Sequence, residues 1–237
     1  MGLQGALQVD RFIKRPSYPT VEWPTAQAEL NRLYPRAASF LLEPELDALE
    51  QFIREKSDSI AGSASLSPWF DSDRTLSRCL YILCRALTPG VVVETGVANG
   101  VSSAFILQAL ATNGHGMLHS VDLPLPGHDP RAIGVLIPNG LRSRWHLHLG
   151  SSRRTLPGVV RAQAVDLFVH DSLHTYRNMR REFDVVWPRI RPGGALVSDD
   201  VGGNSAFDEL RVHGPRYWQV VRQEQKPDAL FGIAIRG

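Results

Sequence analysis

The fold of this chain is decided by one stretch, Val91-Val92-Val93-Glu94-Thr95-Gly96-Val97-Ala98-Asn99-Gly100. Its three valines form a short apolar run, typical of a strand that is covered on both faces of a parallel sheet. Glu94 ends the run, and Gly96 and Gly100 follow in a turn where glycine lets the backbone approach a ligand closely. The residues after the turn predict a helix over residues 102–110. The stretch therefore predicts a strand, a glycine-rich turn and a helix, as in α/β sheets.

The same alternation of strand and helix continues on both sides of this stretch. A leucine stripe predicts a helix over residues 76–87, with Asp71 or Ser72 capping its start and Pro89-Gly90 ending it. A second apolar stripe predicts a helix over residues 176–190, and a short helix is expected over residues 204–210. Further strands are expected at residues 117–123, 145–149, 165–169, 195–198, 217–222 and 230–235. The chain is therefore predicted to form a Rossmann-like open α/β sheet, mostly parallel, with helices on both faces.

The composition changes once along the chain, and we expect a boundary there. Residues 1–68 hold several prolines, Trp23 and an amphipathic pattern over residues 44–56, which predict an irregular arm and a helical cap. Residues 69–237 are expected to form the main domain, with Trp69-Phe70 completing the cover of its ligand site. Because such an arm can pack on a second subunit, a homo-oligomer is one expected assembly.

The overall composition is that of an ordinary globular protein. The 237 residues carry a formal net charge of +2, and 43% are hydrophobic and 21% charged, so the chain can bury one sizeable core. It shows no apolar run of about 20 residues and no secretory signal, and Ala6 stands where a myristoylation motif at Gly2 needs serine or threonine. Its arginines are scattered among acids, so no nucleic-acid surface is expected. Cys79 and Cys84 lack the spacing of a redox or zinc site and are expected in the core. We therefore expect a soluble, cytoplasmic protein without membrane contact.

Polar residues follow the expected strands, at the edge of the sheet where α/β proteins bind their ligands. The first turn is not the GxGxxG of a dinucleotide site. An acid ends the strand and the glycines are four apart, which suits a ligand with a cationic amino-acid end and no phosphate. Asp122 is placed to accept hydrogen bonds from a ribose diol. Further candidates follow the later strands, namely Ser151, Ser152, Asp171, His174, Asp199 and Asp200.

These residues resemble the class I S-adenosylmethionine-dependent methyltransferases. The segment Glu94-x-Gly96-x-x-x-Gly100 is similar to their first motif, and Asp122 to the acid that holds the ribose hydroxyls. The resemblance covers about residues 76–237 and implies a seven-stranded sheet with the last strand inserted antiparallel. It also implies S-adenosylmethionine as cofactor, bound by Glu94, Gly96, Ala98, Gly100, Ser102, Asp122, Ser151 and Ser152.

The second half of the chain is similar to a narrower group. The run Asp171-Ser172-Leu173-His174-Thr175-Tyr176, followed by Trp187-Pro188 and Ser198-Asp199-Asp200, resembles metal-dependent sugar and macrolide O-methyltransferases and cephalosporin-hydroxylase-like proteins. More distantly, it is similar to the catechol and caffeoyl-CoA enzymes. The resemblance implies that Asp171, Asp199 and Asp200 hold a divalent metal, with His174 at the place of a catalytic lysine.

The acids also give a physical argument for a metal. Three carboxylates at the mouths of adjacent strands repel one another unless a cation or protons intervene, and oxygen ligands favour Mg²⁺, Mn²⁺ or Ca²⁺. Such an ion would orient a substrate hydroxyl and lower its pKa, and the imidazole of His174, with a pKa near neutral, would act as general base or position the substrate. The alternative is that Asp199-Asp200 and Asp171 merely cap a turn and a helix.

The sequence therefore predicts an S-adenosylmethionine-dependent O-methyltransferase that acts on a small-molecule hydroxyl of a sugar, polyketide or phenol. Proximity and in-line alignment supply most of the rate in such a reaction. Three alternatives remain open: a hydroxylase-like enzyme on the same fold, an NAD(P)-dependent oxidoreductase, and a non-catalytic relative. The long loop over residues 124–142 is expected to form a wall of the substrate site. His119, His146 and His148 are expected to be hydrogen-bonded structural residues.

Overall fold

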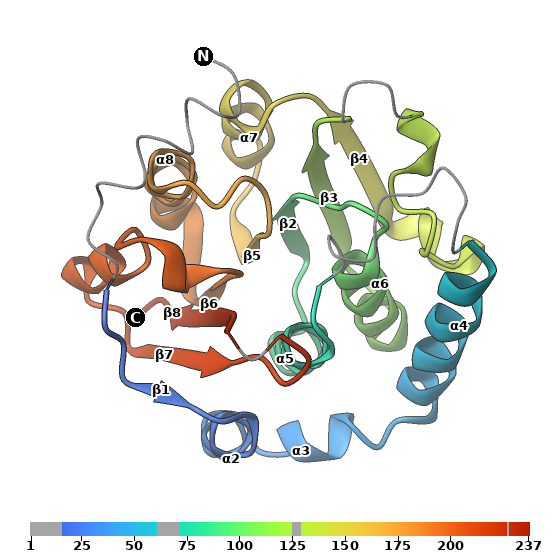
Figure 1. Cartoon of the computed structure of the whole chain (residues 1–237), viewed down its shortest axis with the longest axis horizontal. Helices are drawn as coiled ribbons and strands as arrows, with labels where there is room; N and C mark the ends of the chain where they lie inside the picture. The colour runs from blue at the N-terminus through green and yellow to red at the C-terminus, as the bar shows by residue number, and fades with distance from the viewer. Residues whose placement is uncertain (1–15, 61–71, 125–128, 227) are drawn as a thin grey trace.

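The computed structural model describes residues 16–60, 72–124, 129–226 and 228–237. Its centre is an eight-stranded sheet with the strand order β1-β7-β8-β6-β5-β2-β3-β4 (Figure 1). Neighbouring strands are parallel except that β8 runs antiparallel to β6 and β7. The strands are β1 (Thr20–Val21), β2 (Val91–Thr95), β3 (Met117–Asp122), β4 (Trp145–Leu149), β5 (Val165–His170), β6 (Ile190–Ser198), β7 (Tyr217–Arg222) and β8 (Leu230–Ile235).

The seven strands expected from the sequence are present, and the last of them is inserted antiparallel between β7 and β6. The expected count was nevertheless one strand short. Thr20 and Val21 form β1, which pairs in parallel with Val220 and Val221 of β7. Both β1 residues are β-branched and favour extended backbone. The N-terminal segment therefore covers one edge of the sheet, and β4 is the strand at the other edge.

Helices cover both faces of the sheet, as expected (Figure 1). One face packs against α5 (Arg74–Leu87) and α6 (Val101–Asn113), and the other against α7 (Ser152–Arg161) and α8 (Tyr176–Val186). The N-terminal helices lie against the first group, since α3 contacts α5 and α4 contacts α6. These N-terminal helices are α2 (Trp23–Leu33), α3 (Ala37–Phe40) and α4 (Pro44–Ile60).

The predicted domain boundary after residue 68 stays a prediction. Trp23 and Leu30 of α2 and Leu46 of α4 are buried in the same hydrophobic core as Leu80 of α5. The N-terminal helices thus add apolar contacts to the sheet domain, and burial of large apolar side chains of this kind stabilises a fold by roughly 1.5–3 kcal/mol each.

The start of α5 differs from the expected one. Asp73 is the residue before the helix, and its carboxylate accepts a hydrogen bond from the Thr75 N–H at 2.6 Å, as an N-cap does. The expected cap at Ser72 is wrong, and Asp71 lies outside the described residues. Thr88, in the left-handed conformation, ends the helix next to the predicted Pro89-Gly90 stop.

Two elements in the second half differ from expectation. Strand β6 begins at Ile190 rather than Ala195, because the backbone pairs with β5 on both sides of a register irregularity between Val165 and Leu167. The short helix predicted over 204–210 is a turn followed by a 3-10 helix, Asp208–His213. Asn204 accounts for this, since its side-chain oxygen accepts the Ala206 N–H and competes with a regular helix start.

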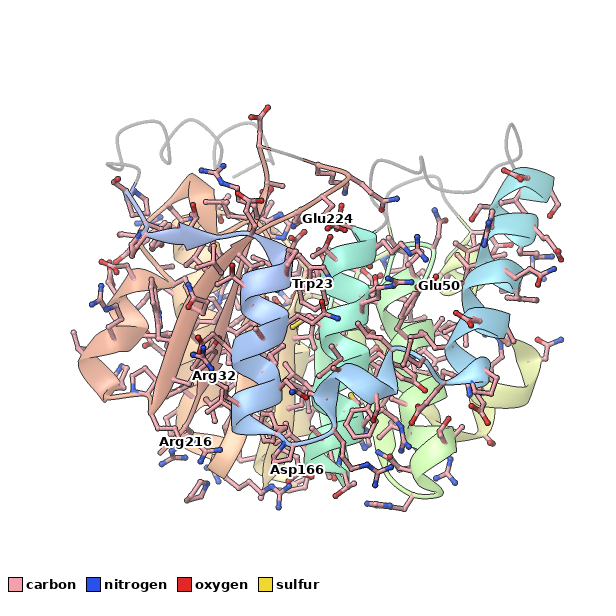
Figure 2. All side chains as sticks on the ribbon, turned by 90° about the horizontal axis from the view of Figure 1, so that it is seen from below. Trp23, Arg32, Glu50, Asp166, Arg216 and Glu224 are labelled. Atoms are coloured by element: carbon pink, nitrogen blue, oxygen red, sulfur yellow. The ribbon has the colours of Figure 1, made fainter. Side chains whose placement is uncertain are left out.

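The two edges of the sheet can be told apart in Figure 2. Glu224, just after β7, lies at the upper side of that view, and Asp166, near the start of β5, lies at the lower side. The upper side is therefore the carboxyl edge, where a ligand site is expected. Cys79 and Cys84 are fully buried free thiols in the core, as expected. None of the helices in the described residues could cross a membrane.

Candidate active site

The carboxyl ends of β2, β5 and β6 are joined by backbone hydrogen bonds that continue just past the strands. The Asp171 N–H donates to the Thr95 carbonyl at 2.8 Å, and the Asp199 N–H donates to the His170 carbonyl at 2.9 Å. The two aspartates therefore lie on adjacent strand ends, directly beside the glycine-rich turn.

Gly96 makes the contact between this turn and the loop after β5. Its φ is +84°, and a Cβ atom placed on it would lie 2.0 Å from the Asp171 carbonyl oxygen and 2.9 Å from the Ser172 nitrogen. No other residue fits there, because any side chain would collide with the Asp171 backbone, and a φ in this range also favours glycine. The candidate cofactor turn and the first candidate metal ligand are thus in direct backbone contact.

Glu94 lies fully buried below the turn, on the side of α6. Its carboxylate accepts hydrogen bonds from the hydroxyls of Ser102 at 2.6 Å, Ser103 at 2.5 Å and Ser120 at 2.8 Å. Burial raises the pKa of Glu94 to about 7 despite these three donors. The hydrogen bond between Glu94 and Ser102 therefore fixes the turn to α6. The predicted contact of these two side chains with a cofactor stays a prediction.

We expect Glu94→Gln to remove a pH dependence of stability. The folded-state pKa of about 7 lies above the ordinary 4.5, so the protonated form is favoured by folding and stability is lost as pH rises from 4.5 through 7. The loss amounts to about 3 kcal/mol for this carboxyl. Urea unfolding of both proteins between pH 4.5 and 8 measures it: the wild-type free energy of unfolding should fall relative to the variant. A difference that stays constant with pH would refute this account of Glu94.

Part of the long loop after β3 packs onto the turn. The Gly134 N–H donates to the Ala98 carbonyl at 3.0 Å and the Leu136 N–H to the Asn99 carbonyl at 2.9 Å. A Cβ atom on Gly100 would lie 2.8 Å from the Cα of Gly134, so this contact also requires glycine. The loop thus buttresses the turn, and its expected role as a substrate wall stays a prediction.

Asp122 holds the open side of the turn. Its Oδ2 accepts the Val97 and Ala98 N–H groups at 3.0 and 3.1 Å, and its Oδ1 accepts the Leu123 N–H at 2.7 Å. Burial raises the pKa of Asp122 in spite of these bonds. Each carboxylate oxygen has about two acceptor sites, so Oδ1 keeps one for a ligand hydroxyl.

Ser151 and Ser152 stand beside Asp122, at the start of α7. The Gly150 N–H donates to the Asp122 carbonyl at 2.8 Å, which fixes this neighbourhood. Leu123 and Leu149 next to them are 59% and 54% exposed. Exposed leucines beside a carboxylate suit a ligand that joins a flat apolar ring to a polyhydroxyl group.

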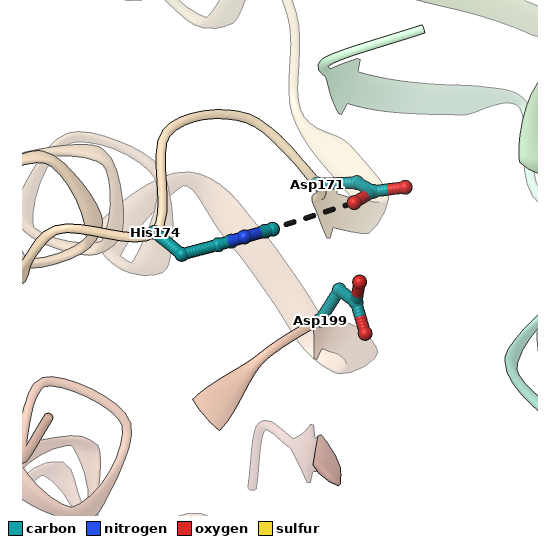
Figure 3. A group of neighbouring side chains, drawn as sticks. All are labelled: Asp171, His174 and Asp199. Carbon is teal, nitrogen blue, oxygen red and sulfur yellow. Dashed lines mark ion pairs between the residues drawn. The ribbon is translucent and has the colours of Figure 1, made fainter. Parts of the chain in front are cut away.

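A second group of polar side chains lies next to the turn, at the ends of β5 and β6. Asp171, His174 and Asp199 offer ligand atoms that all lie within 4.8 Å of one another (Figure 3). The Nε2 atom of His174 is 3.6 Å from Oδ1 of Asp171, beyond hydrogen-bond range, and is buried without a hydrogen-bond partner in the described residues. An unpartnered buried nitrogen between two carboxylates is an arrangement that a divalent cation satisfies.

The carboxylates of Asp171 and Asp199 repel each other, and both attract a charge on His174. Burial, together with the charge of Asp171, raises the pKa of Asp199 to about 7. Burial opposes a charge on His174, but the nearby carboxylates of Asp171 and Asp200 outweigh it and raise its pKa to about 10. Without a cation, His174 is therefore protonated at neutral pH, and the expected near-neutral imidazole is not what this environment produces.

Asp200 lies apart from the group of three. Its side chain is 53% exposed, its backbone is left-handed at a φ of +51°, and its Oδ2 lies 3.4 Å from the other ring nitrogen, Nδ1, of His174. The structure thus brings His174, rather than Asp200, together with Asp171 and Asp199. Asp200 precedes the short 3-10 helix Val201–Gly203, but its side chain makes no capping hydrogen bond there.

Two supports of this group were not found from the sequence. The first is Glu182 of α8, which is buried and accepts hydrogen bonds from Ser172 and Asn178 at 3.0 Å each and from Thr95 at 2.6 Å, and pairs with His170 Nδ1 at 2.7 Å. Burial alone would raise the pKa of Glu182, but the His170 imidazole and the donors lower it to about 2. Glu182 therefore anchors the loop that carries Asp171 and His174. In the sequence, the only feature that distinguishes Glu182 is its position as a polar residue beside the apolar stripe of α8.

The second support is Gln223, just after β7. Its side chain is buried and its amide Nε2 donates to Oδ1 of Asp199. The following residues tie it in place, because the Glu224 N–H donates to the Thr75 hydroxyl and the Gln225 N–H to the Asp73 carboxylate. Nothing in the sequence indicated that this side chain would point to the candidate site.

The comparison with protein families gives one match. Residues 93–201 match the family model described as "Methyltransferase domain". The match begins within β2 and ends just after Asp200. It therefore includes the glycine-rich turn and the acid–histidine group, which is Asp171, His174 and Asp199. No curated protein matches the chain.

Several solved structures share the fold. An O-methyltransferase from Bacillus cereus in complex with SAH is 15% identical, with a TM-score of 0.59, and covers 90% of this chain and 98% of its own. The O-methyltransferase TomG from Streptomyces achromogenes, involved in tomaymycin synthesis and in complex with SAM, is 17% identical at a TM-score of 0.58, over 91% and 97% of the chains. The SAH-bound methyltransferase PaMTH1 from Podospora anserina is 13% identical at a TM-score of 0.54, over 94% and 100%. At these identities the likeness concerns the fold.

Proposed function

We propose that this chain, whose residues 93–201 match a methyltransferase-domain model, is an S-adenosylmethionine-dependent O-methyltransferase of small-molecule hydroxyls. The observation that carries the proposal is the contact at Gly96, where the turn expected to bind the cofactor touches the backbone of Asp171. A methyl group and a hydroxyl held on either side of this contact would be neighbours. Holding the donor sulfur, the methyl carbon and the acceptor oxygen in line accounts for most of the rate in such a transfer.

The cofactor half of the site is the turn with its surroundings. The backbone of Gly96, Ala98 and Gly100 would follow the amino-acid end of the cofactor, and Oδ1 of Asp122 would accept a ribose hydroxyl. Ser151 and Ser152 would lie beside the base. The supporting facts are the left-handed backbone at Gly96, Ala98 and Gly100 and the free acceptor capacity of Asp122.

The metal half of the site is Asp171, His174 and Asp199. Two carboxylates and one imidazole suit Mn²⁺, and Mg²⁺ or Ca²⁺ less well because both prefer oxygen ligands alone. When bound, such an ion would hold the substrate oxygen and lower the pKa of its hydroxyl. Asp171 and Asp199 would supply the charge, Gln223 would keep Asp199 turned toward the group, and Glu182 would hold the loop of His174.

His174 keeps the two roles expected from the sequence. Its raised pKa comes from carboxylates whose charge a bound cation would offset, so its proton would be lost more easily in the loaded site. As the alternative to holding the ion, an imidazole without its proton would accept the proton of the substrate hydroxyl while the methyl group moves from sulfur to oxygen. The other role is to orient that hydroxyl. The substrate class, a homo-oligomeric assembly and a cytoplasmic location remain predictions.

The cofactor half is tested by Asp122→Ala. We expect S-adenosylhomocysteine to bind at least tenfold more weakly, because a charge-assisted hydrogen bond to the ribose is lost, together with the anchor of the Val97 and Ala98 N–H groups. Binding of Mn²⁺, followed by electron paramagnetic resonance, should be unchanged. Calorimetry measures the cofactor affinity of Asp122→Ala and of a control variant, Asp184→Asn, whose side chain lies on the exposed face of α8. Equal loss of both ligands in Asp122→Ala would contradict the division into two halves.

A further inference from the structure

Three histidines meet at the β3–β4 edge of the sheet, away from the acid–histidine group. His119 lies in β3, and His146 and His148 lie in β4 at the edge strand of Figure 1. In the parallel register His119 is opposite His146, and Val121 is opposite His148. Alternate residues of a strand share a face, so all three imidazoles stand on the face that Val121 shares with the α7 and α8 core.

The rings are close enough to act together. Nδ1 of His119 lies 3.2 Å from Nε2 of His148, and the His119 ring stacks on those of His146 and His148 with centroids 5.1 and 5.5 Å away. This confirms the expectation that His119 and His148 are hydrogen-bonded. Two nitrogens on one tetrahedral ion, each at the Zn–N distance of about 2.0–2.1 Å, are separated by about 3.3–3.4 Å. The nitrogen–nitrogen distance of this hydrogen-bonded pair is therefore close to that of two ligands on one ion.

The surroundings keep the nitrogens available. Burial lowers the pKa of His119 and His148, and the neighbouring His146 lowers both further, so the neutral imidazoles that bind metals are favoured. Among the ion pairs of the described residues, none joins a carboxylate to these three rings. A donor set of imidazoles alone favours Zn²⁺, Ni²⁺ or Cu²⁺ over Mg²⁺ and Ca²⁺.

We propose that His119, His146 and His148 form a second metal site, which takes a divalent transition-metal ion. Nδ1 of His119 and Nε2 of His148 are the first two ligands, and the exposed His146 turns its ring to become the third. The ion would join β3 to β4 three residues before Asp122 and three before Ser151. It would stabilise the edge of the sheet that carries these two residues, independently of whether the chain transfers methyl groups.

The experiment is a calorimetric titration of Zn²⁺ into the full chain carrying Asp171→Asn and Asp199→Asn, which removes the carboxylates of the other group. We expect one ion per chain with micromolar affinity, and a loss on the order of tenfold or more in His119→Gln, His148→Gln or His146→Gln. His213→Gln, at a histidine of the short helix Asp208–His213, is the matched control. Co²⁺ absorption in the same Asp171→Asn, Asp199→Asn chain gives a second readout, and its visible bands should disappear with the same three histidine variants.

His146→Gln distinguishes the loss of a metal ligand from a folding defect, because this side chain is exposed and its replacement leaves the core intact. Zn²⁺ that binds with unchanged affinity after His119→Gln and His148→Gln would overturn the proposal. Failure of the full chain to bind Zn²⁺ more tightly than millimolar would overturn it as well.

Discussion

Gly96→Ala is expected to abolish cofactor binding and to cost more stability than a typical point substitution. The new methyl group would lie 2.0 Å from the Asp171 carbonyl oxygen, so the turn and the loop after β5 must separate. The left-handed φ adds a further cost of roughly 1–2 kcal/mol. We expect more than 4 kcal/mol of destabilisation, the range of severe steric conflicts in a core. Urea unfolding measures the stability, and calorimetry with S-adenosylhomocysteine measures the affinity, which should fall by at least a hundredfold.

Gly114→Ala separates the two causes. Gly114 has a similar φ of +79°, but a Cβ atom on it meets no heavy atom within 4 Å. This variant should lose only the cost of a left-handed backbone at alanine, roughly 1–2 kcal/mol, and keep its cofactor affinity. If Gly96→Ala behaved like Gly114→Ala, the turn would not be pressed against Asp171, and the two-part site would lose its geometric basis.

Asp199→Asn is expected to remove cation binding while making the protein more stable. Burial and the charge of Asp171 raise the pKa of Asp199 to about 7, so above that pH the folded protein holds a carboxylate that costs free energy. Asparagine keeps the shape and can still accept the Gln223 amide hydrogen bond. We expect Mn²⁺ affinity to fall by roughly a hundredfold, activity to fall with it, and the unfolding midpoint at pH 8 to rise. Functional sites often carry such a cost to stability.

Asp208→Asn is the matched control for this change. Asp208 pairs with Arg211 at the surface, in the 3-10 helix Asp208–His213. It should leave Mn²⁺ affinity and the unfolding midpoint unchanged. A variant Asp199→Asn that binds Mn²⁺ normally would remove Asp199 from the metal half, whereas loss of both Mn²⁺ and S-adenosylhomocysteine would indicate a folding defect.

The backbone of this site could be predicted because its sequence signals are local. The valines of β2, the acid at its end and the spacing of Gly96 and Gly100 specify a strand, a turn and a helix within ten residues. Parallel topology then brings the ends of neighbouring strands to one edge, so Asp171 and Asp199 could be placed close together without knowing any side-chain contact.

The details that could not be predicted depend on side-chain direction and on long-range contacts. Glu94 carries the family-like motif, yet three serines from α6 and β3 take up its oxygens. Asp200 follows Asp199 directly, but a left-handed backbone turns it outward. Gln223 is 24 residues from Asp199 and reaches it because β7, although separated from β6 by β8, ends at the same edge of the sheet.

The strand β1 was missed for a related reason. Two residues are too short to give a periodic pattern, and their pairing depends on the free edge of β7, which lies near the other end of the chain. Edge pairing of this kind is decided by tertiary context rather than by local propensity.

The central claim is that the turn from Glu94 to Gly100 binds S-adenosylmethionine. Titration of S-adenosylhomocysteine into chelator-treated protein, with NAD⁺ titrated in parallel and both repeated with Mg²⁺, tests it most directly. We predict micromolar binding of S-adenosylhomocysteine, on the order of −8 kcal/mol, and no signal from NAD⁺. Binding of NAD⁺ with no binding of S-adenosylhomocysteine would contradict the assignment of the turn and the function built on it.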